Sequence, residues 1–351
     1  MLIRPFTPKD TPAVVRLWNR LVLLDDVPYC EMDEEAFTQK FLRDPNHRPE
    51  LMLTGEENGQ IAGFIHGVSK RVLLPNETES ASPGYITVVM VDPSLRRRGI
   101  AGAMVREMET RFSAMGKRRA ACMESNPVNL PWRIPGTPGH DHNNAPGVDV
   151  EGSGSPFFKA LGYRTTATEQ AMYLNLKEYV PCRDLKERQE KLLAEGIYTG
   201  RYHPEWDDDF DRMCDRIPSD YWRAVLRAET DAWKKNAPCT DLRFLPDGRV
   251  PNGPRILITA NCDHHIVGFT GPVDLQASGR GYFCGICTDP AFARRGIATV
   301  LFNLLMQEFI LEGAAFSTLF TGTDNPARFI YERAGFTVKK RFDFMEKILT
   351  P

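Results

Sequence analysis

The pattern of hydrophobic and polar positions predicts a fixed succession of elements in the first half of the chain. A short apolar strand and a helix are expected over residues 2–21, followed by a hairpin over 51–68. An apolar strand over 86–91 stops at an Asp-Pro pair, a helix begins directly after Gly99, and another strand is expected over 120–124. The apolar positions of the helix keep helical spacing at Ile100, Met104, Val105, Met108, Phe112 and Met115.

The second half repeats this succession, which indicates an internal duplication. A helix is expected after Gly296, with apolar residues at Ile297, Val300, Leu301, Leu304, Leu305 and Phe309. Four segments recur in the same order, and the central pair places Asp289 197 positions after Asp92. The matched segments are 60–64 with 265–269, 85–101 with 285–298, 126–127 with 325–326, and 161–163 with 334–336.

Length and repeat together predict two domains. The 351 residues are 42% hydrophobic and 26% charged, which is typical of globular proteins. We expect an N-terminal domain over 1–178, a connecting helix over 179–195 that starts with a capping box at Asp184, and a C-terminal domain over 196–351. The first copy carries a glycine- and proline-rich insertion over about 128–155, which should form an ordered loop or lid.

Charge and cysteine content exclude several classes of function. A formal net charge of −2 gives no overall field for nucleic acid or an acidic membrane. Neither a signal peptide nor a span of about 18 apolar residues is visible, so we expect a cytoplasmic protein with reduced thiols that binds neither nucleic acid nor membrane. No metal site is expected. Cys284 and Cys287 form a CxxC motif, but strand alternation would point them to opposite faces, and His140 and His142 lack a third ligand.

The turn between strand and helix in each copy suits a phosphorylated ligand. Small residues such as Gly99 and Ala101 let the backbone approach the ligand, and unpaired N–H groups at the helix start point at it. Adjacent arginines can add charge-assisted hydrogen bonds to phosphate oxygens. A pyrophosphate group is therefore the expected ligand.

This turn resembles the pyrophosphate loop of the GNAT superfamily of acyl-CoA-dependent N-acyltransferases, Arg/Gln-x-x-Gly-x-Gly/Ala. The stretch from Arg96 to Ala101 fits fully, whereas the second copy has Ala293 at the first position. The resemblance implies a mixed α+β fold with two tandem GNAT-like domains, each a twisted, mostly antiparallel sheet flanked by helices. It also implies acetyl-CoA as co-substrate and acetyl transfer to an amine, for which a small molecule is favoured over a protein.

A second motif strengthens the resemblance. The segment from Asn325 through Tyr331 to Gly335 is similar to the family's closing helix, whose tyrosine lies near the thioester sulfur. The resemblance implies that Tyr331 is the general acid for the departing thiolate, and positioning would matter more than acidity because an ordinary phenol has a pKa of about 10. The first copy has Phe158 at this place and lacks the phenolic donor.

In the family, a β-bulge in the strand before the loop exposes backbone N–H groups that bind pantetheine and polarise the acyl carbonyl. The resemblance therefore implies cofactor-binding residues on both strands, on both turns and in the closing segment. In the first copy these are Val89, Met90, Val91, Arg96, Arg97, Arg98, Gly99, Ile100, Ala101 and Gly102. In the second they are Ile286, Cys287, Thr288, Arg294, Arg295, Gly296, Ile297, Ala298, Asn325, Arg328 and Tyr331.

Three interpretations stay open. The C-terminal copy, with Tyr331, is favoured as the site of catalysis. The N-terminal copy is the alternative because its loop is complete, and a CoA-responsive protein without turnover is the third. Glu124, Asp324 and Glu332 are candidate bases by location. The fold does not identify the amine acceptor.

Overall fold

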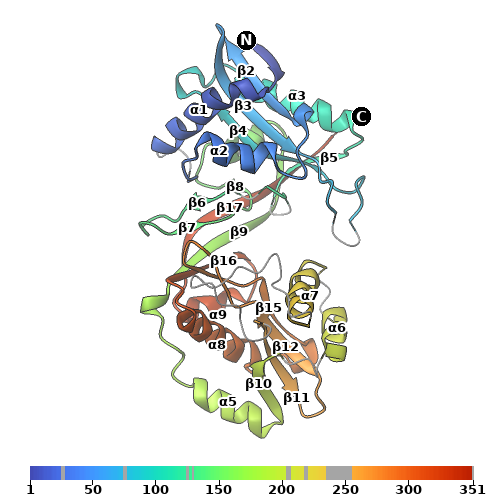
Figure 1. The fold of residues 1–351 in the computed structure, drawn as a ribbon, viewed down its shortest axis with the longest axis vertical. Helices are drawn as coiled ribbons and strands as arrows, with labels where there is room; N and C mark the ends of the chain where they lie inside the picture. Colours follow the sequence, from blue (N-terminus) through green and yellow to red (C-terminus); the bar gives the residue numbers. More distant parts are fainter. Residues whose placement is uncertain are drawn as a thin grey trace. The chain divides into compact units, whose positions relative to one another are not determined.

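The structure is a computed structural model that describes residues 1–24, 28–73, 77–123, 126–128, 130–202, 207–216, 220–234 and 255–349. It divides into two compact units (Figure 1). The first comprises Met1–Gln170 and Lys339–Pro351, and the second comprises Ala171–Val338. Both combine a mostly antiparallel sheet with helices, which confirms the predicted fold class.

The first unit is built on strands in the order β1-β2-β3-β4-β5-β17. Its described strands are β1 (Leu2–Pro5), β2 (Met52–Glu57), β3 (Gln60–Val68), β4 (Gly84–Val91), β5 (Arg119–Cys122), β6 (Trp132–Arg133), β7 (Asp141–His142), β8 (Val148–Asp149) and parts of β9 (Arg164–Asn175) and β17 (Thr337–Ile348). Its helices are α1 (Thr11–Leu23), α2 (Glu34–Phe37), α3 (Ile100–Ala114) and α4 (Gly154–Ala160).

Strand alternation produces two cores in the first unit, one on each face of the sheet. Phe64 and Met90 pack on one face with the apolar side of α1. Their neighbours Ile65 and Val91 pack on the other face with α3. The helices therefore cover opposite faces of one sheet, as Figure 1 shows for α1 and α3.

The second unit repeats this arrangement. Its strands run in the orders β9-β16-β14-β13 and β10-β11-β12-β15. They are β10 (Ile197–Arg201), β11 (Leu257–Asn261), β12 (Ile266–Gly271), β13 (Asp274–Leu275), β14 (Arg280–Tyr282), β15 (Gly285–Thr288) and β16 (Phe316–Gly322). Its helices are α5 (Leu185–Ala194), α6 (Asp207–Arg216), α7 (Asp220–Lys234), α8 (Ile297–Leu311) and α9 (Arg328–Arg333).

The internal repeat extends to strand register. In the first unit, Gly84 pairs with Ala120 in the parallel contact of β4 and β5. In the second, Gly281 pairs with Ser317 in the parallel contact of β14 and β16, and both partners lie 197 positions later. A Cβ added to either glycine would meet a phenylalanine ring of the following long helix, at 2.3 Å in the first unit and 2.6 Å in the second.

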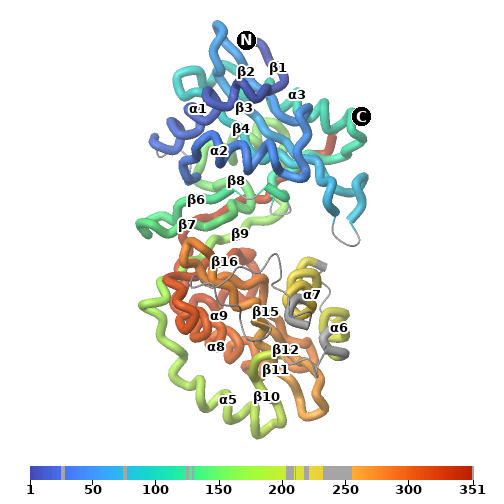
Figure 2. The backbone as a smooth tube through the Cα atoms, in the orientation of Figure 1, coloured from blue at the N-terminus to red at the C-terminus, as the bar shows by residue number. Residues whose placement is uncertain are grey.

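The compact units divide the chain differently from the boundaries expected at 178 and 196. Residues 171–178 fall with the second unit, and the last strand, β17, pairs with β5 in the first, where Figure 2 shows the C-terminal segment. The expected connecting helix is α5, which ends at Ala194, two residues before Gly196 with φ 72°. Asp184 does not cap this helix through its side chain and instead pairs with Arg188 at 2.6 Å.

Candidate active site

The two turns that precede α3 and α8 share one backbone conformation. Arg97 and Arg294 both adopt left-handed backbone, with φ 64° and 63°, and expose their side chains. Two residues later, Gly99 and Gly296 have φ 82° and 91°. A Cβ at Gly99 would meet no atom within 4 Å, so the backbone angle rather than crowding requires glycine there.

An aspartate holds each turn in the same way. The side chains of Asp92 and Asp289 each accept a hydrogen bond of 2.9 Å from the amide two residues later. Each aspartate also forms an ion pair of 2.6 Å, Asp92 with Arg20 of α1 and Asp289 with Arg216 of α6. The repeat therefore includes the contacts that fix the turn.

Both turns present backbone donors at the start of a long helix. The helical hydrogen bonds begin at Ala103 N to Gly99 O and at Val300 N to Gly296 O, both 3.0 Å. The three amides before each of these donors precede the helical ladder, where the helix dipole favours an anion. Both turns could hold a pyrophosphate through these amides, including those of the predicted residues 100–102 and 297–298.

Three of the five predicted arginines beside the turns contact other groups of the protein. Arg98 lies 3.6 Å from Glu57, and Arg295 lies 3.5 Å from Glu195. Arg96 donates to the carbonyl of the strand end at 3.4 Å, and its counterpart in the second unit is an alanine. The side-chain part of the turn thus differs between the units, while the backbone part is the same.

A β-bulge interrupts the antiparallel pairing of β4 with β3 in the first unit. Thr87 is the extra residue in β4 between the strand's pairs with His66 and Gly67. Parallel pairing with β5 covers only Gly84 and Tyr85, so the pairing of these two strands ends two residues before the bulge. The bulge lies two residues before Val89, the first of the predicted cofactor-binding residues of this strand.

The second unit is interrupted at the equivalent place. β14 ends at Tyr282, β15 begins at Gly285, and Cys284, 197 positions after Thr87, donates its amide to Gly271 at 2.9 Å. Parallel pairing again covers only two positions, at Arg280 and the following glycine. Both units therefore open their sheet beside the turn.

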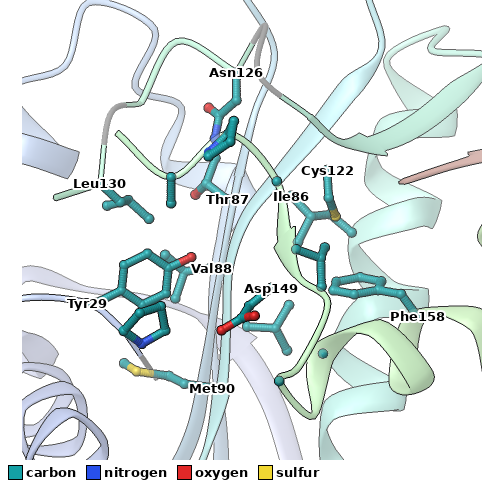
Figure 3. Close-up of a pocket in the computed structure, with 18 of the residues that line it drawn as sticks. Tyr29, Ile86, Thr87, Val88, Met90, Cys122, Asn126, Leu130, Asp149 and Phe158 are labelled. Carbon is teal, nitrogen blue, oxygen red and sulfur yellow. The ribbon is translucent and has the colours of Figure 1, made fainter. Parts of the chain in front are cut away.

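A cavity of about 180 Å³ lies at the opening in the first unit (Figure 3). Ile86 and Phe158 line it and belong to the apolar cluster of the α3 face. Trp18, Val88 and Met90 also line it and belong to the cluster of the α1 face. The cavity is therefore lined by residues from both faces of the sheet.

His66 supports the bulge from inside the sheet. The ring is 1% exposed, and Nδ1 lies 2.5 Å from Thr87 Oγ1, which donates to the carbonyl of His66 at 3.2 Å. Because the hydroxyl has one proton, the imidazole Nδ1 is assigned as the donor to Thr87. Burial lowers the pKa of His66 to about 3, so the ring is neutral at physiological pH.

The insertion of the first copy is ordered and forms part of the cavity wall. Trp132, 1% exposed, stacks on His142 with ring centres 5.7 Å apart and donates to the carbonyl of Asn144 at 2.7 Å. β8 of the insertion pairs with β17, so the last strand of the chain braces this segment. These contacts fit the expectation of an ordered loop.

Two polar residues in the cavity had not been singled out from the sequence. Asp149 of β8 pairs with Lys340 at 2.6 Å and accepts the amide of Glu151 at 3.1 Å. Tyr29 packs on Trp18 with ring centres 5.4 Å apart, and burial, followed by the charge of Asp149, raises its pKa. Both come from segments without regular periodicity, so only their position in the fold reveals them.

Tyr331 lies on α9 and is 7% exposed. Its ring centre is 5.0 Å from that of Phe302 and 6.3 Å from that of Phe336. Burial raises the pKa of Tyr331 to about 12, and its hydroxyl makes no hydrogen bond to the described residues. The corresponding Phe158 on α4 is buried and lines the cavity of the first unit.

The predicted polar residues 324, 325, 328 and 332 lie on or beside α9. Asn325 is exposed and caps the turn before α9 by accepting the amide of Ala327 at 2.9 Å, and Arg328 lies over the ring of Phe329 at 4.8 Å. Asp324 and Glu332 are solvent-exposed. The third candidate base, Glu124, lies outside the described residues.

The CxxC pair does not follow the predicted alternation. Cys284 and Cys287 pack against the same apolar cluster because the interruption before β15 resets which face the strand residues point to. Burial raises the pKa of both thiols. Within the part of the chain that the structure describes, no three histidine, cysteine or acidic side chains are grouped as metal ligands.

Comparison with known proteins identifies both halves of the chain. Residues 2–127 match a family model described as an acetyltransferase (GNAT) domain, and residues 218–336 match one described as the acetyltransferase (GNAT) family. An acetyltransferase of Pectobacterium atrosepticum is 35% identical over 116 residues, which are 33% of this chain and 70% of the relative. An acetyltransferase of Sodalis glossinidius is 33% identical over 116 residues, again 33% of this chain and 70% of the relative.

Solved structures agree on the fold. A GCN5-related glucosamine N-acetyltransferase region of a fungal multi-domain GH3 β-N-acetylglucosaminidase has a TM-score of 0.66 at 14% identity, and the match covers 99% of this chain but 38% of that one. A tandem GNAT protein from the clavulanic acid biosynthesis pathway has a TM-score of 0.52 at 14% identity, covering 100% and 99%. No helix among the described residues is long and apolar enough to span a membrane.

Proposed function

This chain belongs to the GNAT family of acetyltransferases, and from that premise we propose that it transfers an acetyl group from acetyl-CoA to the primary amine of a small molecule. The thioester supplies an acyl group that an amine can attack directly, without a covalent enzyme intermediate. The observation that best supports the proposal is the pair of turns with matching backbone angles at Gly99 and Gly296. Each turn offers the donors that a pyrophosphate needs.

The second unit is the proposed site of acetyl transfer, with Tyr331 as the donor to the departing sulfur. A pKa of about 12 keeps the phenol protonated throughout the neutral range. An ordinary thiol has a pKa of about 8.5, so complete proton transfer from such a phenol is unfavourable. Hydrogen-bond donation to the developing thiolate is the role that fits, because it stabilises charge as it forms.

The first unit is a second candidate for the same reaction. Its cavity is lined by residues of both sheet faces and by the bulged Thr87, and its turn retains Arg96. Phe158 occupies the place of the phenol, so another group or water would assist the leaving thiolate there. The cavity is the specific observation that favours this alternative.

The assignment is tested by replacing the two turn glycines separately. We expect Gly99→Val or Gly296→Val to abolish calorimetric binding of acetyl-CoA by the affected unit, because valine is strained at positive φ. Gly59→Val is a matched control, since Gly59 has φ 76° in a hairpin turn with no atom within 4 Å of an added Cβ. Undiminished affinity in both turn variants would refute the turns as the binding sites.

Turnover separates the two units. Tyr331→Phe should lower acetyl transfer by about one to three orders of magnitude and leave acetyl-CoA affinity unchanged. A panel of primary amines assayed for CoA release gives the readout. Unchanged turnover in this variant, with turnover lost in Gly99→Val, would place catalysis in the first unit.

A further inference from the structure

Beyond acetyl transfer, we propose that the cavity of the first unit binds a small primary amine with an apolar, ring-sized body, and that Asp149 receives its ammonium group. The proposal does not depend on which unit transfers the acetyl group. In the first unit the amine would be the acceptor itself. With catalysis in the second unit, the cavity would be a separate amine site on the same chain.

The size and lining of the cavity define the body of the ligand. Trp18 and Leu21 of α1, Val88 and Met90 of β4 and Leu130 supply apolar surface. The volume of about 180 Å³ is slightly larger than the roughly 150 Å³ apolar cavity known to accept benzene in another protein. One ring with a short amino substituent therefore matches the available space.

The charge of the cavity selects a cation. Among the described lining residues, Asp149 is the one acidic or basic side chain. Figure 3 shows its carboxylate and the hydroxyl of Tyr29 pointing into the same space. Burial raises the pKa of Tyr29, so the phenol stays neutral and adds an aromatic face and a polar tip. Lys340 partly neutralises this carboxylate from outside the cavity, and within the cavity a cation is the group that the carboxylate attracts.

The carboxylate is held in place from outside the cavity. Lys340 of β17 contacts Asp149 Oδ2 at 2.6 Å, and the amide of Glu151 contacts Oδ1 at 3.1 Å. A carboxylate has about four acceptor positions, so these contacts leave room for an ammonium group. Because Lys340 does not line the cavity, it orients Asp149 without occupying the ligand's position. This is the arrangement expected of a preorganised site.

The test compares two probes of the same shape on the full chain without acetyl-CoA. Benzylamine carries the ammonium group, and benzyl alcohol replaces it with a neutral hydroxyl. Ligand-observed NMR titration should show benzylamine binding about tenfold or more tightly than the alcohol, as expected for one charge-assisted hydrogen bond. Equal affinity for the two probes, or no benzylamine binding up to about 10 mM, would overturn the proposal.

Three variants locate the effect. Asp149→Asn should abolish the preference for benzylamine, whereas Glu151→Gln, which removes an exposed charge two residues away, should retain it. Lys340→Gln removes the charge that partly neutralises Asp149 from outside the cavity and should tighten benzylamine binding several-fold. A preference retained in Asp149→Asn, or lost in Lys340→Gln, contradicts the assignment. Thermal unfolding establishes that each variant is folded, and the lysine variant decides the question if Asp149→Asn is not.

Because no acetyl-CoA is present, these measurements stand apart from acetyl transfer. Failure of turnover with every amine would leave the amine preference of the cavity intact. Conversely, an active enzyme with no amine preference in this cavity would disprove the site alone.

Discussion

Acidification should weaken the first unit through His66. The ring is 1% exposed, packs on Phe41 with ring centres 4.9 Å apart, and has its Nδ1 hydrogen-bonded to Thr87. Burial lowers its pKa to about 3, against about 6.5 for an exposed histidine. Between these two pH values His66 is protonated in the unfolded chain and neutral in the folded unit. Stability is therefore fully present above pH 6.5 and is lost as the pH falls toward 3.

For one proton, the free energy of unfolding changes by about 1.4 kcal/mol per pH unit. The first unit should therefore lose about 2–3 kcal/mol of stability between pH 6.5 and 4.5. His66→Asn can keep a donor near Thr87 but cannot titrate, so it should lack this component. Hydrogen exchange by mass spectrometry over 60–91, corrected for intrinsic rates, measures the loss, and peptides of β16 serve as the internal reference. The same pH dependence in wild type and variant would refute a buried neutral imidazole.

Further predictions concern packing and charge. Gly281→Ala should destabilise the second unit by about 1–3 kcal/mol in urea, because its Cβ would lie 2.6 Å from the ring of Phe309, and Phe309→Leu added to it should recover part of the loss. A chain ended at Val338 lacks the strand that pairs with β5 and should show lower exchange protection in β4 and β5. Asp343→Ala leaves the buried Ser155 hydroxyl without its acceptor and should lower exchange protection in the same strands by about 2–4 kcal/mol. Hydrogen bonds from the Arg4 side chain and the Thr7 backbone amide lower the pKa of Asp10 to about 2. The stabilisation that Asp10 contributes is therefore present above about pH 4 and is lost as the pH falls toward about 2. Asp10→Asn should remove this decline from acid titrations of stability.

Local signals in the sequence predicted the parts of the fold that depend on neighbouring residues. The glycine at position 99, the apolar spacing after it and the Asn58-Gly59 hairpin turn each fix backbone angles within a few residues. The place of β17 could not be read in this way, because it depends on pairing across more than 200 residues, such as Met345 with Cys122. Its buried Asp343 accepts from Thr168 at 2.8 Å, a contact that no local pattern announces.

The candidate site likewise has a part that local sequence signals predict and a part that they do not. The turns could be predicted because a helix start and a positive φ leave signatures in a short motif. The cavity could not, because its wall joins α1, the bulge and the insertion, and its carboxylate, Asp149, lies in a two-residue strand. A single aspartate in a glycine-rich loop is ordinarily a solvated turn residue. Only the pairing of β8 with β17 places it beside an apolar cavity.

The duplication explains how two units can keep one binding device and differ in chemistry. Backbone donors depend on φ and ψ alone, and the turn angles of the two units agree within about 10° although Arg96 faces Ala293 in the alignment. Group-specific chemistry depends on side chains, and there the units have diverged, with Phe158 in one and Tyr331 in the other. A phenyl ring cannot donate a hydrogen bond, so the first unit can share the binding of a pyrophosphate without sharing the phenolic step. Side-chain divergence on a conserved backbone turn is therefore sufficient to separate ligand binding from catalysis within one chain.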